Sequence, residues 1–421
     1  MRLDGTGPLA FATVTSARER VQVGLAYLSF VVIGMTAGAT GVLLPAQMRG
    51  YAVDRPTIGT MFFTFSAGFA LAGVITGPLV HGAGFRWALV GGNAAALVAG
   101  LATAAAPAFW LFVAVQLLAG LGIGILESVL NTHLTTLPRS AVRLGRMHAC
   151  FGLGALAGPL VATWLLRSHD WPAVVLVTSL PFVPLLAAMV VAHAVDPEPP
   201  VATPGPSPVE AADTGGVRVR TGLLAVLRER PVVLAAAFLA VYTGLEATLG
   251  DWAFSYLVED RGRSDLVAGN AVSGYWLGLT LGRVAISPLA ERVRWSVART
   301  STACLLGVVA AAAGVWLVPS AGAAAAGLAL LGFFLGPLFP TTMAIMPQVT
   351  SARSVAAAIG LLNAASVIGG SVLPWLAGAL TQGIALWTLL PYVAALALVQ
   401  LGLWLPLTRH TAAPPPSPHP A

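Results

Sequence analysis

Residues 77–86 read Gly-Pro-Leu-Val-His-Gly-Ala-Gly-Phe-Arg, and residues 287–294 read Ser-Pro-Leu-Ala-Glu-Arg-Val-Arg. Each stretch is short and follows the second long apolar run of its own half of the chain. A further matching pair lies in the fourth run of each half, Gly-x-Gly-x-Gly at 120–124 and Gly-x-x-x-Gly-Pro at 332–337. Such weak self-similarity predicts a chain built from two related halves.

The composition places most of the protein's surface against lipid. Of the 421 residues, 57% are hydrophobic and 9% are charged, and the mean hydropathy is +0.84. Soluble domains usually carry about 25% charged residues. The net charge is +6, but the basic residues, all arginine, are scattered through short loops, which argues against a nucleic-acid partner. Arginine without lysine indicates a GC-rich bacterial genome.

Twelve apolar runs reach the length of about 20 residues that a helix needs to cross a bilayer. They cover approximately residues 21–47, 57–80, 86–105, 108–137, 145–166, 172–193, 231–257, 266–289, 298–318, 321–346, 354–380 and 386–407. The first run is too long for a signal-peptide core, so we expect it to be retained. We predict an all-α membrane protein with twelve transmembrane helices in two pseudo-symmetric six-helix bundles.

The distribution of arginine predicts the orientation in the membrane. With the N-terminus inside, sixteen arginines fall in inner segments and five in outer ones. This asymmetry obeys the positive-inside rule and places both termini in the cytoplasm. We therefore expect a multi-pass protein of the bacterial cytoplasmic (inner) membrane.

The long interruption between runs six and seven divides the chain into domains. It is rich in proline and weakly hydrophobic, as expected of an extended linker. The predicted units are an N-terminal bundle (1–195), a cytoplasmic linker (196–230), a C-terminal bundle (231–410) and a disordered tail (411–421).

Ionisable residues within the spans are candidate functional groups, because burying charge in a membrane is unfavourable. Glu127 in the fourth span has Asn131 four residues later, so both side chains share a helix face. In the seventh span, Glu246 shares its face with Tyr242 and Thr243, a set suited to hydroxylated solutes. A helix-packing hydrogen bond is the alternative role for either glutamate.

Other polar residues are weaker candidates. Asp251 is expected near the outer membrane interface, where a solvated charge is readily tolerated, and Trp252 follows it. Asn363 in the eleventh span is a candidate lining residue. Arg283 is expected to reach the cytoplasm or to pair with Glu291 rather than to bind a solute.

No motif indicates an enzyme. The chain lacks the P-loop pattern of an ATP-driven protein, and no His/Cys spacing suits a metal. Both cysteines, Cys150 and Cys304, lie in apolar runs and are expected to be free thiols. No cofactor is expected.

The loop segments resemble those of the major facilitator superfamily, whose pattern after the second span is Gly-x-Leu-Ala-Asp-Arg-x-Gly-Arg-Arg. The first loop matches it at Gly77, Leu79, Gly84 and Arg86, with His81 in the aspartate position and Gly82 in the following arginine position. The second loop keeps Leu289, Ala290 and Arg292, with Glu291 in the acidic position. The resemblance implies the family fold and a gating role for Gly77, Gly84, Arg86, Glu291 and Arg292.

Two segments are similar to the fucose and glucose permease branch of that family. They are Gly124 to Asn131 in the fourth span, and Tyr242-x-Gly-x-Glu leading to Asp251-Trp252 in the seventh. The similarity implies that Glu127 handles protons or binds sugar and that Glu246 anchors the solute from the other half. Fucose permease has an aspartate in its first span, whereas the first span here contains no acid.

The resulting hypothesis is secondary active transport of a small polar solute, of sugar or polyol type, by proton-coupled alternating access. Sodium is the alternative coupling ion, and a monomer is expected. A rival hypothesis is a proton-driven exporter of a drug, antibiotic or other amphipathic metabolite. It rests on Gly145-x8-Gly154-x3-Gly158-Pro159 in the fifth span, which resembles the antiporter signature of drug-exporting members. A third alternative is a transporter-like sensor that moves nothing.

Overall fold

The computed structural model describes residues 17–192, 226–351 and 354–411, and these residues form helices without any strand. The N-terminal half contains α1 (Ala17–Tyr51), α2 (Arg55–Ile58), α3 (Thr60–Ala104), α4 (Phe109–Thr135), α5 (Ser140–Leu165), α6 (Trp171–Ser179) and α7 (Phe182–Ala192). The C-terminal half contains α10 (Arg230–Ser255), the π-helix η1 (Tyr256–Asp260), α11 (Asp265–Arg292), α12 (Val297–Leu317), α13 (Ala321–Leu335), α14 (Leu338–Ala344), α15 (Met346–Val349), α16 (Val355–Gly383), the 3₁₀-helix η2 (Leu386–Thr388) and α17 (Leu389–Thr411).

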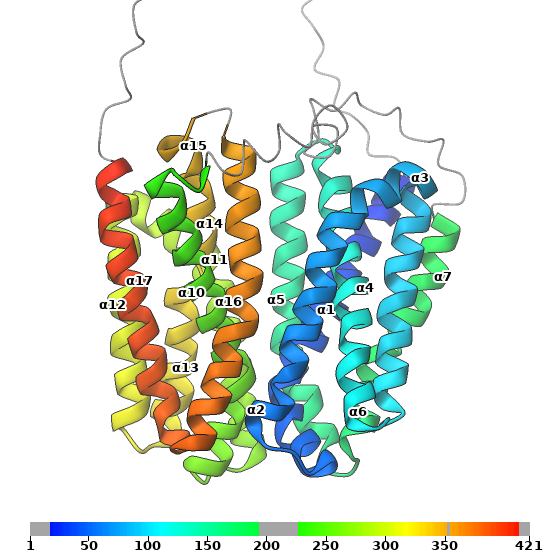
Figure 1. Ribbon diagram of the computed structural model, residues 1–421, viewed down its shortest axis with the longest axis horizontal. Coiled ribbons are helices and arrows are strands. Elements are labelled where there is room, and N and C mark those ends of the chain that lie inside the picture. The colour runs from blue at the N-terminus through cyan, green and yellow to red at the C-terminus, as the bar shows by residue number, and fades with distance from the viewer. Residues whose placement is uncertain (1–16, 193–225, 352–353, 412–421) are drawn as a thin grey trace, which may run out of the picture.

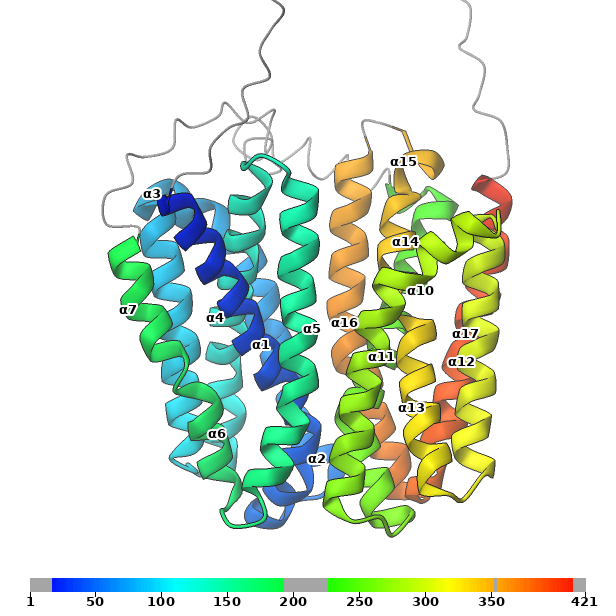
Figure 2. The ribbon, with the colours of Figure 1, turned by 180° about the vertical axis from the view of Figure 1, so that it is seen from behind.

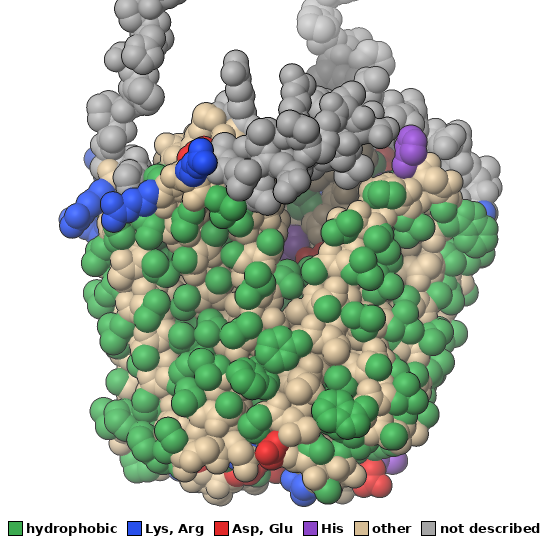
Figure 3. Space-filling view, viewed as in Figure 1, with side chains coloured by type: hydrophobic (Ala, Val, Ile, Leu, Met, Phe, Trp, Pro, Cys, Tyr) green, Lys and Arg blue, Asp and Glu red, His purple; other side chains and the backbone are tan. Residues whose placement is uncertain are grey.

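The two halves lie side by side with their long helices roughly parallel (Figures 1 and 2). Hydrophobic side chains cover the middle of the visible surface, whereas charged side chains gather at its two ends (Figure 3). A surface of this kind suits a bilayer, whose hydrocarbon core excludes unpaired charge. The predicted class, an all-α membrane protein of two helical bundles, is confirmed.

Within the described residues, ten helices are long and apolar enough to cross a membrane. The predicted number of twelve differs at two places. Spans two and three form one continuous element that ends at Ala104. In addition, α11 has 28 residues but is not among the ten, since glycines, polar residues and Arg283 interrupt its apolar sequence. The count of twelve stays a prediction.

The prediction of a loop at 77–86 is wrong, because this segment is part of α3. Gly84 alone departs from helical geometry, with φ 85° and ψ 162°, and it marks a kink between the two spans. Glycine adopts positive φ without the steric penalty of a Cβ, so this residue type permits the bend. Similarly, the second loop segment lies within α11 as far as Arg292.

Two predicted spans are interrupted by prolines. The run at 172–193 forms α6 and α7, with a break at Pro181, and the run at 321–346 forms α13 and α14, with a break at Gly336-Pro337. Proline has no backbone N–H, so a helix is weakened where it occurs.

The same helix crossings occur in both halves and are made by glycines. Gly154 of α5 lies against the Val31 carbonyl of α1, and Gly369 of α16 lies against the Ala240 carbonyl of α10. A Cβ at either glycine would collide with that backbone. Small residues allow membrane helices to approach closely and gain packing contacts. The first and fifth helices of each half therefore pack in the same way.

The glycines of the fourth spans serve the second repeated crossing. Gly120 of α4 lies against the Phe65 carbonyl of α3, and Gly332 of α13 lies against the Tyr275 carbonyl of α11. This equivalence supports the internal repeat predicted from the sequence. The linker at 196–230 and the tail at 411–421 lie almost entirely outside the described residues, so their character stays a prediction.

Candidate functional site

The surface is hollowed between the two halves near the end at which α1 begins and α17 ends (Figures 1 and 3). A histidine and an acidic side chain are visible inside this hollow (Figure 3). The two halves also touch along α5 and α11: Gly152 leaves no room for a Cβ beside Thr280, and the rings of Phe151 and Trp276 lie 6.5 Å apart.

The N-terminal half contributes a polar cluster from α4 and α5. The Asn131 side chain donates to the backbone carbonyl of Glu127 over 2.8 Å, and its amide oxygen lies 3.3 Å from Nε2 of His148. Phe30 packs its ring edge-on to His148, with centroids 5.4 Å apart. Glu127 and Asn131 do share a helix face, but their contact involves the Glu127 backbone and leaves the carboxylate unused.

The Glu127 side chain is half-buried, and among the described residues its carboxylate forms no hydrogen bond or ion pair. A carboxylate removed from water is normally paired or hydrogen-bonded. A Glu127 carboxylate without such a partner fits a group that binds a proton or a solute. His148 lies near the start of α5, and its exposed side chain and its contact with Asn131 add it to the cluster.

The C-terminal half contributes an ion pair between two helices. Nη2 of Arg283 on α11 lies 3.3 Å from Oε1 of Glu246 on α10. The Tyr275 hydroxyl donates to the backbone carbonyl of Glu246 over 3.0 Å. The interpretation that Arg283 reaches the cytoplasm or pairs with Glu291 is therefore wrong. Its charge was visible in the sequence, but its partner is 37 residues away.

The other candidates of this half occupy different environments. Tyr242 is buried, and its hydroxyl lies beside Glu246 and Arg283. Asp251 is half-buried where α10 meets Gly41 of α1. Trp252 is fully buried and donates through Nε1 to the Pro374 carbonyl over 2.8 Å, a contact that ties α10 to α16.

Asn363 has an exposed side chain on α16. Of the candidate gating residues, Gly84 forms the kink in α3 and Gly77 lies within that helix. Arg86 stacks over the ring of Trp87, with 5.0 Å from Cζ to the centroid. Glu291 and Arg292 are exposed at the end of α11, and among the described residues neither forms an ion pair. Their gating role stays a prediction.

At the end opposite the hollow, the two halves are joined by a polar contact that sequence reasoning missed. Arg55, which begins α2, lies 2.5 Å from Glu259 of η1 and 3.1 Å from Gln382 of α16. Trp375 of α16 donates through Nε1 to the Pro56 carbonyl over 3.2 Å. We call the contacts of Arg55 with Glu259 and Gln382 the outer latch, because the distribution of arginine predicts that this end faces outward.

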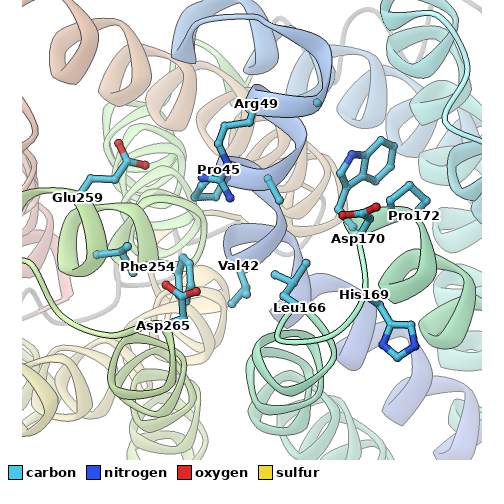
Figure 4. A pocket seen from close by; sticks show the side chains of 14 residues that line it. Val42, Pro45, Arg49, Leu166, His169, Asp170, Pro172, Phe254, Glu259 and Asp265 are labelled. Carbon is cyan, nitrogen blue, oxygen red and sulfur yellow. The ribbon is translucent and has the colours of Figure 1, made fainter.

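A cavity of about 520 Å³ lies beside this latch and takes walls from both halves. Glu259 and Asp265 lie on one side of it, and His169 and Asp170 lie on the other, with Arg49 of α1 between them (Figure 4). The cavity is remote from Glu127 and Glu246, neither of which contributes to its walls.

A bundle of apolar helices with ionisable side chains facing each other between two halves defines a membrane transporter rather than an enzyme. The profile of the Major Facilitator Superfamily matches residues 26–264 and 248–421. The chain therefore belongs to the major facilitator superfamily, and it is a multi-pass membrane transporter.

Three relatives are similar in sequence. Bypass of stop codon protein 6 of Saccharomyces cerevisiae is 25% identical, over 90% of this chain and 80% of its own length. The glucose/mannose transporter GlcP of Bacillus subtilis is 24% identical, over 84% and 86%. The 4-hydroxybenzoate transporter PcaK of Pseudomonas putida is 25% identical, over 41% and 39%.

Solved structures share the fold at low identity. The nucleoside transporter NupG has a TM-score of 0.73 at 11% identity, with 95% of this chain and all of that chain covered. A bacterial homologue of the human lysosomal transporter Spinster, in an inward-facing unoccupied conformation, has a TM-score of 0.73 at 14% identity, over 94% and 97%. These likenesses establish the architecture of this chain.

Proposed function

We propose that this protein is a proton-coupled secondary transporter of a small polar solute, of sugar or polyol type, in the bacterial cytoplasmic membrane. The observation that carries the proposal is the pair of polar clusters described above. Asn131 and His148 lie beside the unpaired Glu127 in one half, and Glu246 pairs with Arg283 in the other. Polar groups facing each other between two related halves fit a solute site near the midplane.

The asymmetry of the two ends supports alternating access. One end is hollowed, whereas the other is joined by the outer latch. The excess of arginine at the hollowed end, where both termini of the described chain lie, favours placing that end in the cytoplasm. The described conformation is then open to the cytoplasm and closed to the outside. Similarity to GlcP, whose name refers to glucose and mannose, favours a sugar-like solute.

The test is accumulation of labelled sugars and polyols in proteoliposomes under an imposed pH gradient. We expect the gradient to drive accumulation in the wild type and Glu127→Gln or Glu246→Gln to lose it while retaining facilitated exchange. Asp170→Asn, at an exposed carboxylate of the outer end, is the matched control. Full gradient-driven accumulation in Glu127→Gln would show that Glu127 does not couple transport to the proton. Dependence of accumulation on a sodium gradient would show that sodium, rather than the proton, is the coupling ion.

The exporter hypothesis gains no further support from the fifth span. Gly154 and Gly158 of α5 lie against the backbone of α1, so close helix packing accounts for both. Protection of expressing cells from hydrophobic cations or antibiotics would nevertheless decide for export.

A further inference from the structure

Arg283 has hydrogen-bonding capacity that the protein does not use. A guanidinium carries five N–H donors, whereas the partners of Arg283 among the described residues are Glu246, at 3.3 Å, and the neighbouring Tyr242 hydroxyl. Charge-assisted hydrogen bonds are usually about 2.7–2.9 Å long and are often bidentate. Nε has no partner, and the side chain is 31% exposed. The pair is therefore a single long contact, with most donors still available.

The surroundings of the pair contain one further carboxylate, that of Asp251 on α10, which lies within electrostatic reach of Tyr275. Arg283 and Tyr275 face Glu246 from α11, and Tyr242 lies beside it on α10. The described residues of α16, which also packs against α10, include no titratable side chain. From the other half, His148 of α5 lies within electrostatic reach of Arg283. The donors of Arg283 and the imidazole of His148 thus face the same space from opposite halves.

We propose that the solute carries an anionic group, such as the carboxylate of a sugar acid, and that this group replaces Glu246 as the partner of Arg283. When Glu246 accepts a proton, its negative charge disappears and Arg283 is left without a counter-ion in a partly buried site. An unpaired buried charge is strongly unfavourable, so an anion binds there to restore the pair. One proton is taken up by Glu246 for each carboxylate bound, and the site keeps its net charge.

This inference rests on the proposed function and names the substrate class of the same site. A neutral sugar offers hydrogen bonds but no charge, so it does not compensate Arg283 when Glu246 is protonated. A dianion such as a phosphate ester leaves one charge unpaired. A hydroxylated monocarboxylate satisfies both the guanidinium and the hydroxyl-bearing side chains around it, Tyr242 among them.

The experiment compares acids with neutral analogues of the same carbon skeleton. Binding of D-gluconate and D-glucitol, and of D-glucuronate and D-glucose, is measured calorimetrically on the purified full chain in buffers that differ in ionisation enthalpy. We expect each acid to bind roughly ten- to a hundredfold more tightly than its analogue, as for hydrogen bonds to a charged group. Binding should take up about one proton and strengthen as pH falls.

Variants separate this role from a structural one. Glu246→Gln should bind the acids without proton uptake, because its amide cannot accept the proton. The double variant Glu246→Gln/Arg283→Gln removes both charges without leaving one unpaired, and it should lose the preference for acids. Arg299→Gln, at an exposed arginine of the same half, should behave as wild type.

Two results overturn the inference in distinguishable ways. If the neutral analogues bind as tightly as the acids, or if the wild type binds acids without proton uptake, the anionic class is wrong and neutral-solute transport stands. If the folded protein neither binds nor transports any of the four compounds, the proposed function fails together with this inference.

Discussion

Replacing Arg55 by glutamine should open the outer end of the protein. Arg55 contacts Glu259 at 2.5 Å and Gln382 at 3.1 Å, and the side chains of the ion pair are 13% and 34% exposed. An exposed ion pair contributes about 0.2–1 kcal/mol, whereas breaking a buried one costs about 3–5 kcal/mol. This partly exposed pair lies between those limits, so we expect about 1–2 kcal/mol. The ratio of latched to open molecules should fall about 5- to 30-fold.

The assay is the distribution of distances between spin labels across the outer end. Labels at Arg167→Cys and Ile384→Cys, both exposed there, report on the separation of the halves once the two native cysteines are serine. Arg55→Gln should increase the population at long distance. Arg49→Gln is the control, because Arg49 lies at the same end and forms no ion pair among the described residues. An unchanged distribution in Arg55→Gln, or an equal change in Arg49→Gln, refutes the latch.

Three further substitutions test helix packing, a hydrogen bond between helices and a helix cap. Gly369→Val should prevent α16 from approaching α10 and lower the melting temperature by several degrees, whereas Gly360→Val, which faces open space, should be tolerated. Trp252→Phe should lose the bond to the Pro374 carbonyl and about 1 kcal/mol of unfolding free energy, measured by denaturant titration, while transport persists. Asp54→Ala should remove the N-cap of α2 and loosen the latch by about 1 kcal/mol in the spin-label assay, whereas Asp54→Asn should keep it.

Much of the fold follows from the sequence because the bilayer imposes it. A run of about twenty apolar residues has few alternatives to a spanning helix. The glycines at 120–124 and 332–337 likewise predicted equivalent positions that proved to be equivalent helix crossings. The kink at Gly84 was harder to predict from the sequence. A positive φ within a nearly continuous helix has no sequence pattern other than the glycine itself.

The site was harder to predict, since it depends on how helices face one another. Arg283 lies about 14 Å from the inner end of α11, and Glu246 lies about 24 Å from the inner end of α10, at 1.5 Å per residue. Their depths differ by about 10 Å on this measure, so the sequence did not indicate that they form a pair. The length of the Arg283 side chain and the relative placement of the two helices bring the pair together. Neither Arg55 nor Glu259 could be recognised as a functional residue from the sequence. Charged residues near helix ends are common, and the partner in the ion pair is not evident before the fold is known.

The latch has a consequence for how a solute experiences the two faces of the membrane. In the proposed alternating-access mechanism, a molecule arriving from the hollowed face meets a site that is already open. A molecule arriving from the latched face can bind only to the fraction of proteins whose latch is broken, and its apparent dissociation constant rises by the reciprocal of that fraction. The same side chains therefore present two apparent affinities. The solute concentration that gives half-maximal transport should differ between right-side-out and inside-out vesicles. The substitution Arg55→Gln should bring the two concentrations closer together.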